Sequence, residues 1–304
     1  MDLLKEVKDI LHPFGELDLL CYYSIVAGRL QDFLKDKEIA AKIHLSGKIP
    51  KLLKRGSRLT PLFVPDLAQV NADFLKLRVG NHLKDVRNRI TPQQILLWEY
   101  FFPRKMIDLL YACNKEHPGL PIERIFIDID KGKHIASEVA QEATLSLVQQ
   151  IREDREFNKL AKYRPVILWT GNSFHVYLLL EEKVPSLFYK QSLSYGDDKK
   201  NSGNFPVRWA RQITASTGIR VEAGHEKTED HLILDTSGTP SGKLARAPFS
   251  LHIKNYQEFD GIAVPLSLED LKKKNLVKEL RKLTPEKVAK NLNAYARLLY
   301  YDQI

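Results

Sequence analysis

Two different patterns of hydrophobic and polar positions follow one another along the chain. In residues 1–120 apolar side chains recur mostly at helical spacing, which predicts a mainly helical N-terminal part. Helices are expected over Leu3–Leu11, over Leu17–Phe33 and over Pro92–Cys113. The last of these has a clear start, because Thr91 can cap it and proline is favoured at the first helical position.

Strand patterns begin after Pro121. Short apolar runs bounded by turn residues predict strands over 124–130, 166–169, 173–180 and 231–235. Helical periodicity predicts helices over 135–160 and 206–217. Residues 246–254 are expected to be extended, and residues 192–205, which are rich in Gly, Ser and Asn, to form a mobile loop.

The last part of the chain is again predicted to be helical. One helix is expected to begin at Ser267 and another to run from Thr284 to about Tyr301. The whole pattern predicts an α+β fold with three consecutive parts: a helical segment 1–120, a motif-bearing core 121–262 and a helical segment 263–304. The last helix has no obvious stop signal, as in a piece of a longer polypeptide.

Composition narrows the classes of function. The 304 residues are 43% hydrophobic, enough to bury a sizeable core, and 47 basic against 38 acidic residues give a net charge of +9. That surplus favours a polyanionic partner such as nucleic acid. No apolar run is long enough to predict a membrane span. The two cysteines, Cys21 and Cys113, form no Cys/His cluster, so neither zinc nor an iron–sulfur cluster is expected, and so few cysteines suit a cytoplasmic location.

Asp128 and Asp130 are the first candidate site. They are two positions apart at the end of an apolar strand, so both carboxylates lie on the same face. Carboxylates that close repel one another unless a cation lies between them, and hard oxygen ligands suit Mg²⁺ or Mn²⁺. The alternative is a simple acidic turn before Lys131-Gly132-Lys133. The same pattern also occurs in glycosyltransferases and nucleases.

A turn followed by a strand carries the second candidate site. Gly171-Asn172 predicts a turn that presents Ser173 and His175 on one face of the next strand. A hydroxyl and an imidazole side by side can both donate hydrogen bonds to phosphate oxygens. The alternative is a structural histidine after a hairpin turn.

A third acid and a basic segment form the third candidate site. Asp235 ends an apolar strand, as Asp128 does, and is a natural third metal ligand. In an extended segment one face would present an anion-binding row, made of Arg246, Ser250, His252 and Lys254. The alternative is a solvated basic edge strand.

The order of these three motifs resembles the catalytic subunit of archaeo-eukaryotic primases. The sequence is most similar to the primase-polymerases of archaeal plasmids and viruses, over about Ile122–Lys254. The resemblance implies an RRM-like catalytic core that faces a second α/β unit. This sequence differs from many members of that family. They have a zinc-binding Cys/His cluster, and this chain has too few cysteines to form one.

By matching position, the resemblance also implies roles for the motif residues. Asp128, Asp130 and Asp235 would bind two Mg²⁺ or Mn²⁺ ions, and Ser173 and His175 would hold the phosphates of the incoming nucleotide. The basic segment would contact the triphosphate or the primer end, through Arg246, Ser250, His252 and Lys254.

The expected activity is DNA priming and polymerisation: nucleotidyl transfer from an NTP or dNTP to a 3′-hydroxyl on a single-stranded DNA template. Further polymerase or helicase modules, in this chain or another, are expected partners. The basic stretch Lys35–Arg58 is a candidate wall of the template groove, or else an exposed helical face. Arg87 and Arg89 either contact template phosphates or belong to a solvated loop.

Three alternatives stay open at this point. The first is a metal-dependent nuclease, and the second is a repair polymerase that extends ends without priming. The third is a non-catalytic module that binds single-stranded nucleic acid. Three acids at strand ends argue against the third alternative, because their mutual repulsion costs stability and would serve no purpose in a silent domain.

Overall fold

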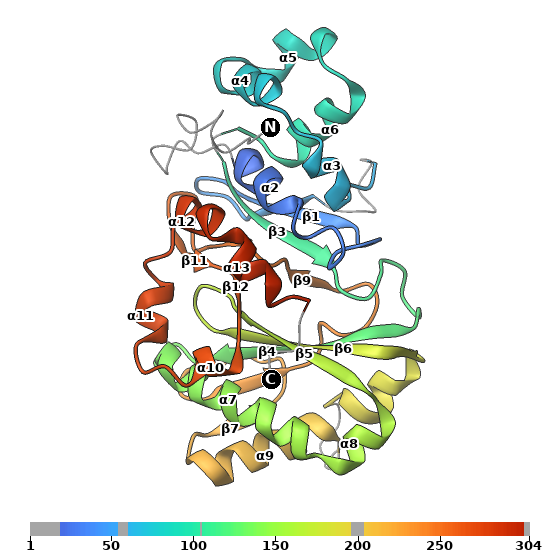
Figure 1. The fold of residues 1–304 in the computed structure, drawn as a ribbon, viewed down its shortest axis with the longest axis vertical. Coiled ribbons are helices and arrows are strands. Elements are labelled where there is room, and N and C mark those ends of the chain that lie inside the picture. Colours follow the sequence, from blue (N-terminus) through green and yellow to red (C-terminus); the bar gives the residue numbers. More distant parts are fainter. Residues whose placement is uncertain (1–18, 54–59, 104, 196–203, 301–304) are drawn as a thin grey trace. The chain divides into compact units, whose positions relative to one another are not determined.

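The computed structural model describes residues 19–53, 60–103, 105–195 and 204–300. The chain forms two compact units, each built from several stretches of sequence (Figure 1). Unit 1 comprises Met1–Ala112, Arg246–Ala263 and Leu283–Arg297, and unit 2 comprises Cys113–Ala245, Val264–Lys282 and Leu298–Ile304. Both units mix helices with sheet, which confirms the α+β class.

A six-stranded sheet forms the centre of unit 2. Its strands occur in the order β12-β5-β6-β4-β8-β7. All neighbours are antiparallel except β7 and β8. The strands are β4 (Ile122–Lys131), β5 (Tyr163–Trp169), β6 (Phe174–Val184), β7 (Val221–Ala223), β8 (Leu232–Asp235) and β12 (Val264–Leu266). The central strand β4 therefore lies between the Ser-x-His strand β6 and the Asp235 strand β8.

Helices α7 and α9 cover one face of this sheet (Figure 1). The helical elements of unit 2 are α7 (Ser137–Glu153), α8 (Arg155–Leu160), η4 (Tyr189–Leu193), α9 (Phe205–Thr217), α10 (Leu268–Leu271) and α11 (Leu276–Leu280). Ile125, Ile127 and Ile129 of β4 share one face and are fully buried, while Asp128 on the other face keeps 29% of its side chain exposed. We therefore assign the face with these isoleucines to the helices and the acidic residues to the opposite face of the sheet.

Unit 1 contains two smaller sheets, apart from Leu244 and Ala245, which fall within the range of unit 2. One has the strand order β2-β1-β3-β9, and the other pairs β10 with β11. The strands are β1 (Ile39–His44), β2 (Lys51–Leu53), β3 (Met106–Ala112), β9 (Leu244–Arg246), β10 (Leu251–Ile253) and β11 (Phe259–Ile262). The helical elements are α2 (Leu19–Ala27), α3 (Val64–Ala68), α4 (Ala72–Gly80), α5 (Leu83–Val86), η3 (Arg87–Arg89), α6 (Pro92–Tyr100), α12 (Pro285–Lys290) and α13 (Leu292–Arg297).

The expectation of a helix over Pro92–Cys113 was wrong in its second half. Thr91 caps helix α6 as expected and accepts a hydrogen bond from the Gln94 amide, but the helix ends at Tyr100. Pro103 explains the break, because proline disfavours helical backbone in the residue before it. The apolar run that follows is strand β3, which is buried on both faces, and such a run cannot be distinguished from a buried helix by periodicity.

Other expectations for the N-terminal part were also too helical. The basic stretch Lys35–Arg58 contains strands β1 and β2, so it is not an exposed helical face, and its residues 54–59 lie outside the described part. Helix α2 is shorter than the expected Leu17–Phe33. The predicted helix Leu3–Leu11 lies outside the described residues.

Boundaries elsewhere agree more closely with the pattern. Strands β5, β6 and β8 and helices α7, α8 and α9 occur where they were expected. Ser267 and Thr284 each cap a helix through the side-chain oxygen, although the helix expected up to Tyr301 is divided into α12 and α13. Of the polar loop 192–205, residues 196–203 lie outside the described part. Within the described residues, no helix is long and apolar enough to cross a bilayer.

Candidate active site

The three predicted metal ligands lie together on the face of the unit 2 sheet opposite to helices α7 and α9. Asp128 on β4 is directly opposite Asp235 on β8, and Asp130 is opposite Ile233. Because side chains two positions apart on a strand share a face, all three carboxylates lie on the same side of this strand pair. Strand pairing thus brings together acids that are more than 100 residues apart in the sequence.

The pKa of Asp130 responds to burial and to both neighbouring acids. Burial raises the pKa of the Asp130 carboxyl, and the negative charges of Asp128 and Asp235 raise it further, to about 7, against an opposing effect of Lys227. A carboxyl group in such a position is stabilised either by a proton or by a cation. Its surroundings therefore fit a divalent metal ion, which would take the place of the proton.

The three carboxylates are not yet arranged as ligands of one metal ion. Within the described ranges, no three His, Cys, Asp or Glu side chains are arranged closely enough to hold a metal ion. One oxygen of Asp235 is engaged instead by the Tyr195 hydroxyl and by the Ser237 amide, at 2.5 and 2.6 Å. Binding of a cation by all three acids would therefore require the side chains to rotate toward one another.

His175 lies next to Asp128 and is largely shielded from solvent. Its Nε2 is 3.2 Å from Asp128 Oδ1, and only 8% of its side chain is exposed. The ring also packs edge-on against Phe126, with ring centroids 4.8 Å apart. The Nδ1 atom is buried and has no hydrogen-bond partner among the described residues. His175 is thus in a position to orient Asp128, while its second nitrogen has hydrogen-bonding capacity left.

Ser173 supports the turn that leads to His175. The expected hairpin is present, with Trp169 paired to Phe174 and Gly171 in the left-handed region at φ 103°. Ser173 donates its hydroxyl hydrogen to the Ile129 carbonyl of β4. This hydroxyl is therefore already used within the protein, and binding of a phosphate by Ser173 stays a prediction.

Tyr195 and His225 are two residues near the acids that the sequence analysis missed. Tyr195 donates to Asp235, and its ring stacks on that of His225, with centroids 5.6 Å apart. Burial and the bond to Asp235 raise the pKa of the Tyr195 hydroxyl, so it stays protonated. Its place at the edge of a polar, Gly-rich loop gave no periodic signal that could have identified it.

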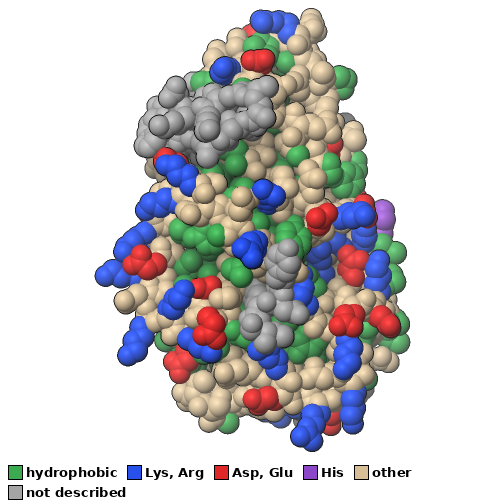
Figure 2. Space-filling model, in the orientation of Figure 1, with side chains coloured by type: hydrophobic (Ala, Val, Ile, Leu, Met, Phe, Trp, Pro, Cys, Tyr) green, Lys and Arg blue, Asp and Glu red, His purple; other side chains and the backbone are tan. Residues whose placement is uncertain are grey.

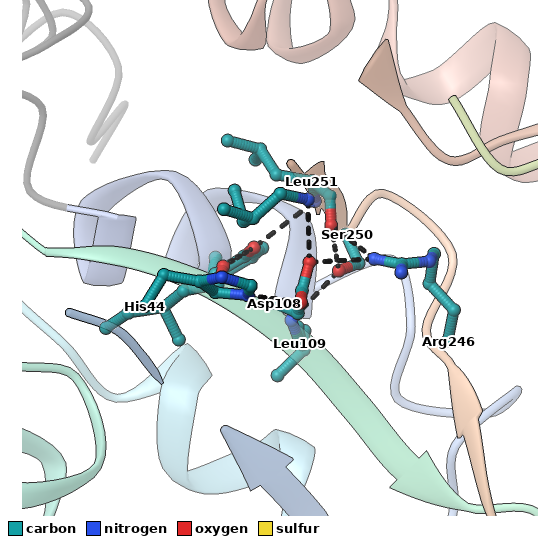
Figure 3. Close-up of polar contacts among 9 residues, drawn as sticks. His44, Asp108, Leu109, Arg246, Ser250 and Leu251 are labelled. Atoms are coloured by element: carbon teal, nitrogen blue, oxygen red, sulfur yellow. Dashed lines mark hydrogen bonds and ion pairs between the residues drawn. The ribbon is translucent and has the colours of Figure 1, made fainter. Parts of the chain in front are cut away.

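The basic motif belongs to unit 1 and is not one extended strand. Strand β9 ends at Arg246, and β10 begins at Leu251. Between them Phe249 has a left-handed backbone, with φ 67°, so the alternation of faces is interrupted. The expected row of four side chains on one face was therefore wrong, although Arg246 and Ser250 still lie close to one another (Figure 3).

A buried carboxylate, Asp108 on β3, organises this motif. Its Oδ1 accepts from Arg246 Nη1 at 2.9 Å and from the Ile253 amide at 3.0 Å, and its Oδ2 is 3.0 Å from His44 Nε2 (Figure 3). Burial alone would raise the pKa of Asp108, but Arg246 and the hydrogen bonds lower it to about 2. The sequence analysis missed Asp108 because the residue lay within a predicted helix.

The other residues of the basic motif differ in their surroundings. Ser250 is fully buried, and its hydroxyl accepts from the Leu109 amide and donates to the Leu251 carbonyl. His252 is half-buried, and Lys254 is exposed, 3.4 Å from Glu258. Ser250 is thus engaged in holding the turn, whereas Lys254 is accessible to a ligand.

Comparisons with known proteins bear on the fold. No protein-family model matches the chain, and no curated protein matches its sequence. Among solved structures, the chain is similar to the polymerase domain of ligase D from Mycobacterium tuberculosis in complex with DNA. The TM-score is 0.56 and the sequence identity 13%, with 93% of this chain and 91% of that chain covered. At this level of identity the similarity shows a shared fold, so the chain has the fold of that polymerase domain.

Proposed function

We propose that the protein is a DNA primase-polymerase that transfers nucleotides from NTPs or dNTPs to a 3′-hydroxyl on a DNA template. The observation that carries this proposal is the acidic face of unit 2, where Asp128, Asp130 and Asp235 lie on adjacent strands and where burial, Asp128 and Asp235 raise the pKa of Asp130. The polymerase-domain fold supports it. The strand order β5-β6-β4-β8, with α7 and α9 between strands in the sequence, supports the RRM-like core as part of the same proposal.

The roles of the residues follow from their positions. Asp128, Asp130 and Asp235 would hold two Mg²⁺ or Mn²⁺ ions, which when bound lower the pKa of an attacking hydroxyl and neutralise the leaving pyrophosphate. His175 would orient Asp128 through the contact between its Nε2 and the carboxylate. The residues nearest the acids thus supply binding and orientation, and no side-chain nucleophile is needed.

Residues of the basic motif would bind the negative charge of the nucleotide or of the primer. Asp108 accepts a hydrogen bond from Arg246 Nη1 at 2.9 Å, which orients the guanidinium. A planar guanidinium matches the geometry of phosphate oxygens, so Arg246 would bind a triphosphate. Lys254 is exposed and would act as a mobile positive charge. The similarity to primase-polymerases of archaeal plasmids and viruses remains a proposal that rests on these motifs.

A second candidate, a polymerase that extends ends without priming, is favoured by one observation. The similar solved structure is a polymerase domain of a ligase, and that domain is in complex with DNA. Both candidates would use the same carboxylates. They differ in whether the enzyme can also join the first two nucleotides of a new chain without a primer. Unprimed and primed templates therefore separate them.

Extension of a labelled primer on a DNA template tests the common part of both candidates. With Mg²⁺ or Mn²⁺ and dNTPs, the wild type is expected to extend the primer. Asp128→Asn and Asp130→Asn are each expected to lose about 10²- to 10³-fold in rate, the scale observed when one transition-state stabiliser is removed. Asp230→Asn is the matched control, because Asp230 is exposed in the same unit just before β8. Equal extension by all four proteins would overturn the proposal.

A further inference from the structure

Unit 2 has a concave surface at the end of the β5–β6 hairpin opposite to the turn that carries Ser173 and His175. This pocket has a volume of about 830 Å³ and is lined by the first residues of β5, by the middle of β6 and by residues from α7 and α8. Strand β5 is seven residues long, so the pocket lies on the order of 20 Å along the hairpin from the turn. It is therefore separate from the carboxylates.

The charge of the pocket lining is mainly positive. Arg152, Lys162 and Arg164 contribute three positive charges, and Glu181 contributes one negative charge. The Nη2 atom of Arg152 is buried and has no hydrogen-bond partner among the described residues. A buried guanidinium N–H without a partner is costly, and a bound anion would remove that cost.

The two other basic groups, Arg164 and Lys162, differ in how they are held. Arg164 donates from Nη2 to the Leu299 carbonyl at 2.7 Å, which fixes the direction of its side chain at the pocket. Lys162 is exposed and can follow a ligand. One fixed guanidinium beside a flexible ammonium is a combination that can hold a phosphate group at the surface.

The remaining lining is apolar and aromatic. Tyr163, Pro165 and Leu179 contribute to the wall, and the Tyr163 ring packs on Phe157 with centroids 5.5 Å apart. Burial raises the pKa of the Tyr163 hydroxyl to about 12, so it stays a neutral donor. Ligand pockets of about 300–1,000 Å³ combine such apolar walls with a few polar groups. A free phosphate ion would contact little of this apolar wall, whereas the base of a nucleotide could pack against it.

We propose that this pocket binds a nucleotide through its phosphate groups, as a site distinct from the carboxylate face. The ligand is either a free nucleotide or one unit of a nucleic-acid strand, because both present the same base and phosphate chemistry. The site does not depend on the activity proposed above, since none of the carboxylates takes part in it.

Binding in the absence of divalent metal tests this site. Wild-type protein in EDTA and low salt is titrated with fluorescently labelled ATP, with a labelled single-stranded DNA tetranucleotide and with a labelled tetraglutamate peptide. Arg152→Gln/Lys162→Gln removes two charges from the pocket, and Arg155→Gln/Lys159→Gln, on exposed positions of α8, removes two outside it. The pocket variant is expected to bind at least about tenfold more weakly, and the control variant to bind like the wild type.

The three probes separate the sources of the ligand. Preferential loss of ATP binding identifies a free nucleotide, and preferential loss of tetranucleotide binding identifies a strand. Equal binding by the pocket variant and the control, no binding of either nucleotide probe by the wild type, or equally strong binding of the peptide would each overturn the proposal. If the pocket variant does not fold, as judged by its thermal unfolding, Lys162→Gln alone replaces it, because that side chain is exposed.

Discussion

At the scale of single residues, the acidic face of unit 2 and the basic motif of unit 1 each contain a carboxylate whose pKa is shifted from its usual value. The pKa of Asp130 is raised to about 7 by burial and by two neighbouring acids, whereas that of Asp108 is lowered to about 2 by a guanidinium and hydrogen bonds. The first arrangement costs stability and is suited to a cation. The second contributes stability and holds Arg246 in place.

Divalent metal is expected to stabilise the wild type but not an Asp130→Asn variant. A ligand that binds the native state raises the unfolding temperature, and removing one carboxylate weakens a metal site. Thermal unfolding is measured in EDTA and then with excess Mg²⁺ or Mn²⁺, with Asp230→Asn as the control. In EDTA the Asp130→Asn variant is expected to be at least as stable as the wild type, because a repulsion has been removed. The same increase with metal in all three proteins would contradict the metal-site assignment.

Replacing the buried acid, by contrast, is expected to destabilise the protein. Asp108→Asn leaves the Arg246 guanidinium without its charged partner, a change that costs about 3–5 kcal/mol when a buried pair is broken. Denaturant unfolding measures this loss, and Asp85→Asn, on an exposed position of the same unit, is the control. An effect of Asp108→Asn no larger than that of the control would show that the network contributes little.

The same residue predicts how stability depends on pH. The pKa of Asp108 is lower in the folded protein, about 2, than the usual 3.8, so the unfolded state binds its proton first as pH falls. Its contribution, about 2 kcal/mol from this shift, is fully present above pH 4 and is lost as pH falls toward 2. Unfolding free energies at pH 5 and pH 2.5 are compared for the wild type and Asp108→Asn, and the difference between the proteins should shrink at the lower pH.

At the scale of elements, the sequence predicted strands β4, β5, β6 and β8 of unit 2 because each has its own local signal, whereas the three-residue strands β7 and β12 were missed. Asp128, His175 and Asp235 follow or begin short apolar runs between turn residues, and strand pairing then places them together. Strand β3 had no such signal, since a strand buried on both faces has no alternation. The left-handed backbone of Phe249 could not be predicted either, because bulky residues rarely adopt it. Consequently the acidic residues of unit 2 were predicted and the network around Asp108 in unit 1 was not.

The turn after β4 is an element-level test of the acidic face. A Cβ at Gly132 would lie 2.6 Å from the backbone of Glu229, just before β8. Gly132→Ala is therefore expected to push the approach to β8 away from β4, to lower the stability by about 1–3 kcal/mol and to reduce activity. Gly224→Ala is the control, since the added Cβ would meet only Ile233 at 3.9 Å. Unfolding and primer extension are measured for both, and wild-type behaviour of Gly132→Ala would show that this spacing does not matter.

At the scale of the whole molecule, the surplus of positive charge favours binding of a polyanion such as DNA. On the face drawn in Figure 2, the lysine and arginine side chains of the described residues are interspersed with acidic ones. Much of the basic stretch Lys35–Arg58 is either in strands or outside the described residues, so its role in a template groove remains a prediction. Because the net charge of +9 is a property of the whole chain, its effect on DNA binding is measured with the whole chain.

Single-stranded DNA is expected to bind in a salt-dependent way. Phosphate contacts release counterions, so affinity for a strand should fall by about 10²-fold or more when the salt rises from roughly 50 to 200 mM. Fluorescence anisotropy with a labelled strand measures this slope, and the same titration with a neutral-backbone analogue of the strand is the control. A slope near zero would contradict binding through basic side chains.

The most direct test of the central claim is synthesis on unprimed single-stranded DNA. Wild-type protein, Asp130→Asn and Asp230→Asn are incubated with Mg²⁺ or Mn²⁺ and with labelled NTPs or dNTPs, beside a primed template. A primase-polymerase is expected to make new oligonucleotides in the wild type and in Asp230→Asn, but not in Asp130→Asn. Extension of primers without new oligonucleotides would contradict priming and favour the extension polymerase. Undiminished synthesis by Asp130→Asn, or no synthesis on either template, would contradict nucleotidyl transfer at the acidic face.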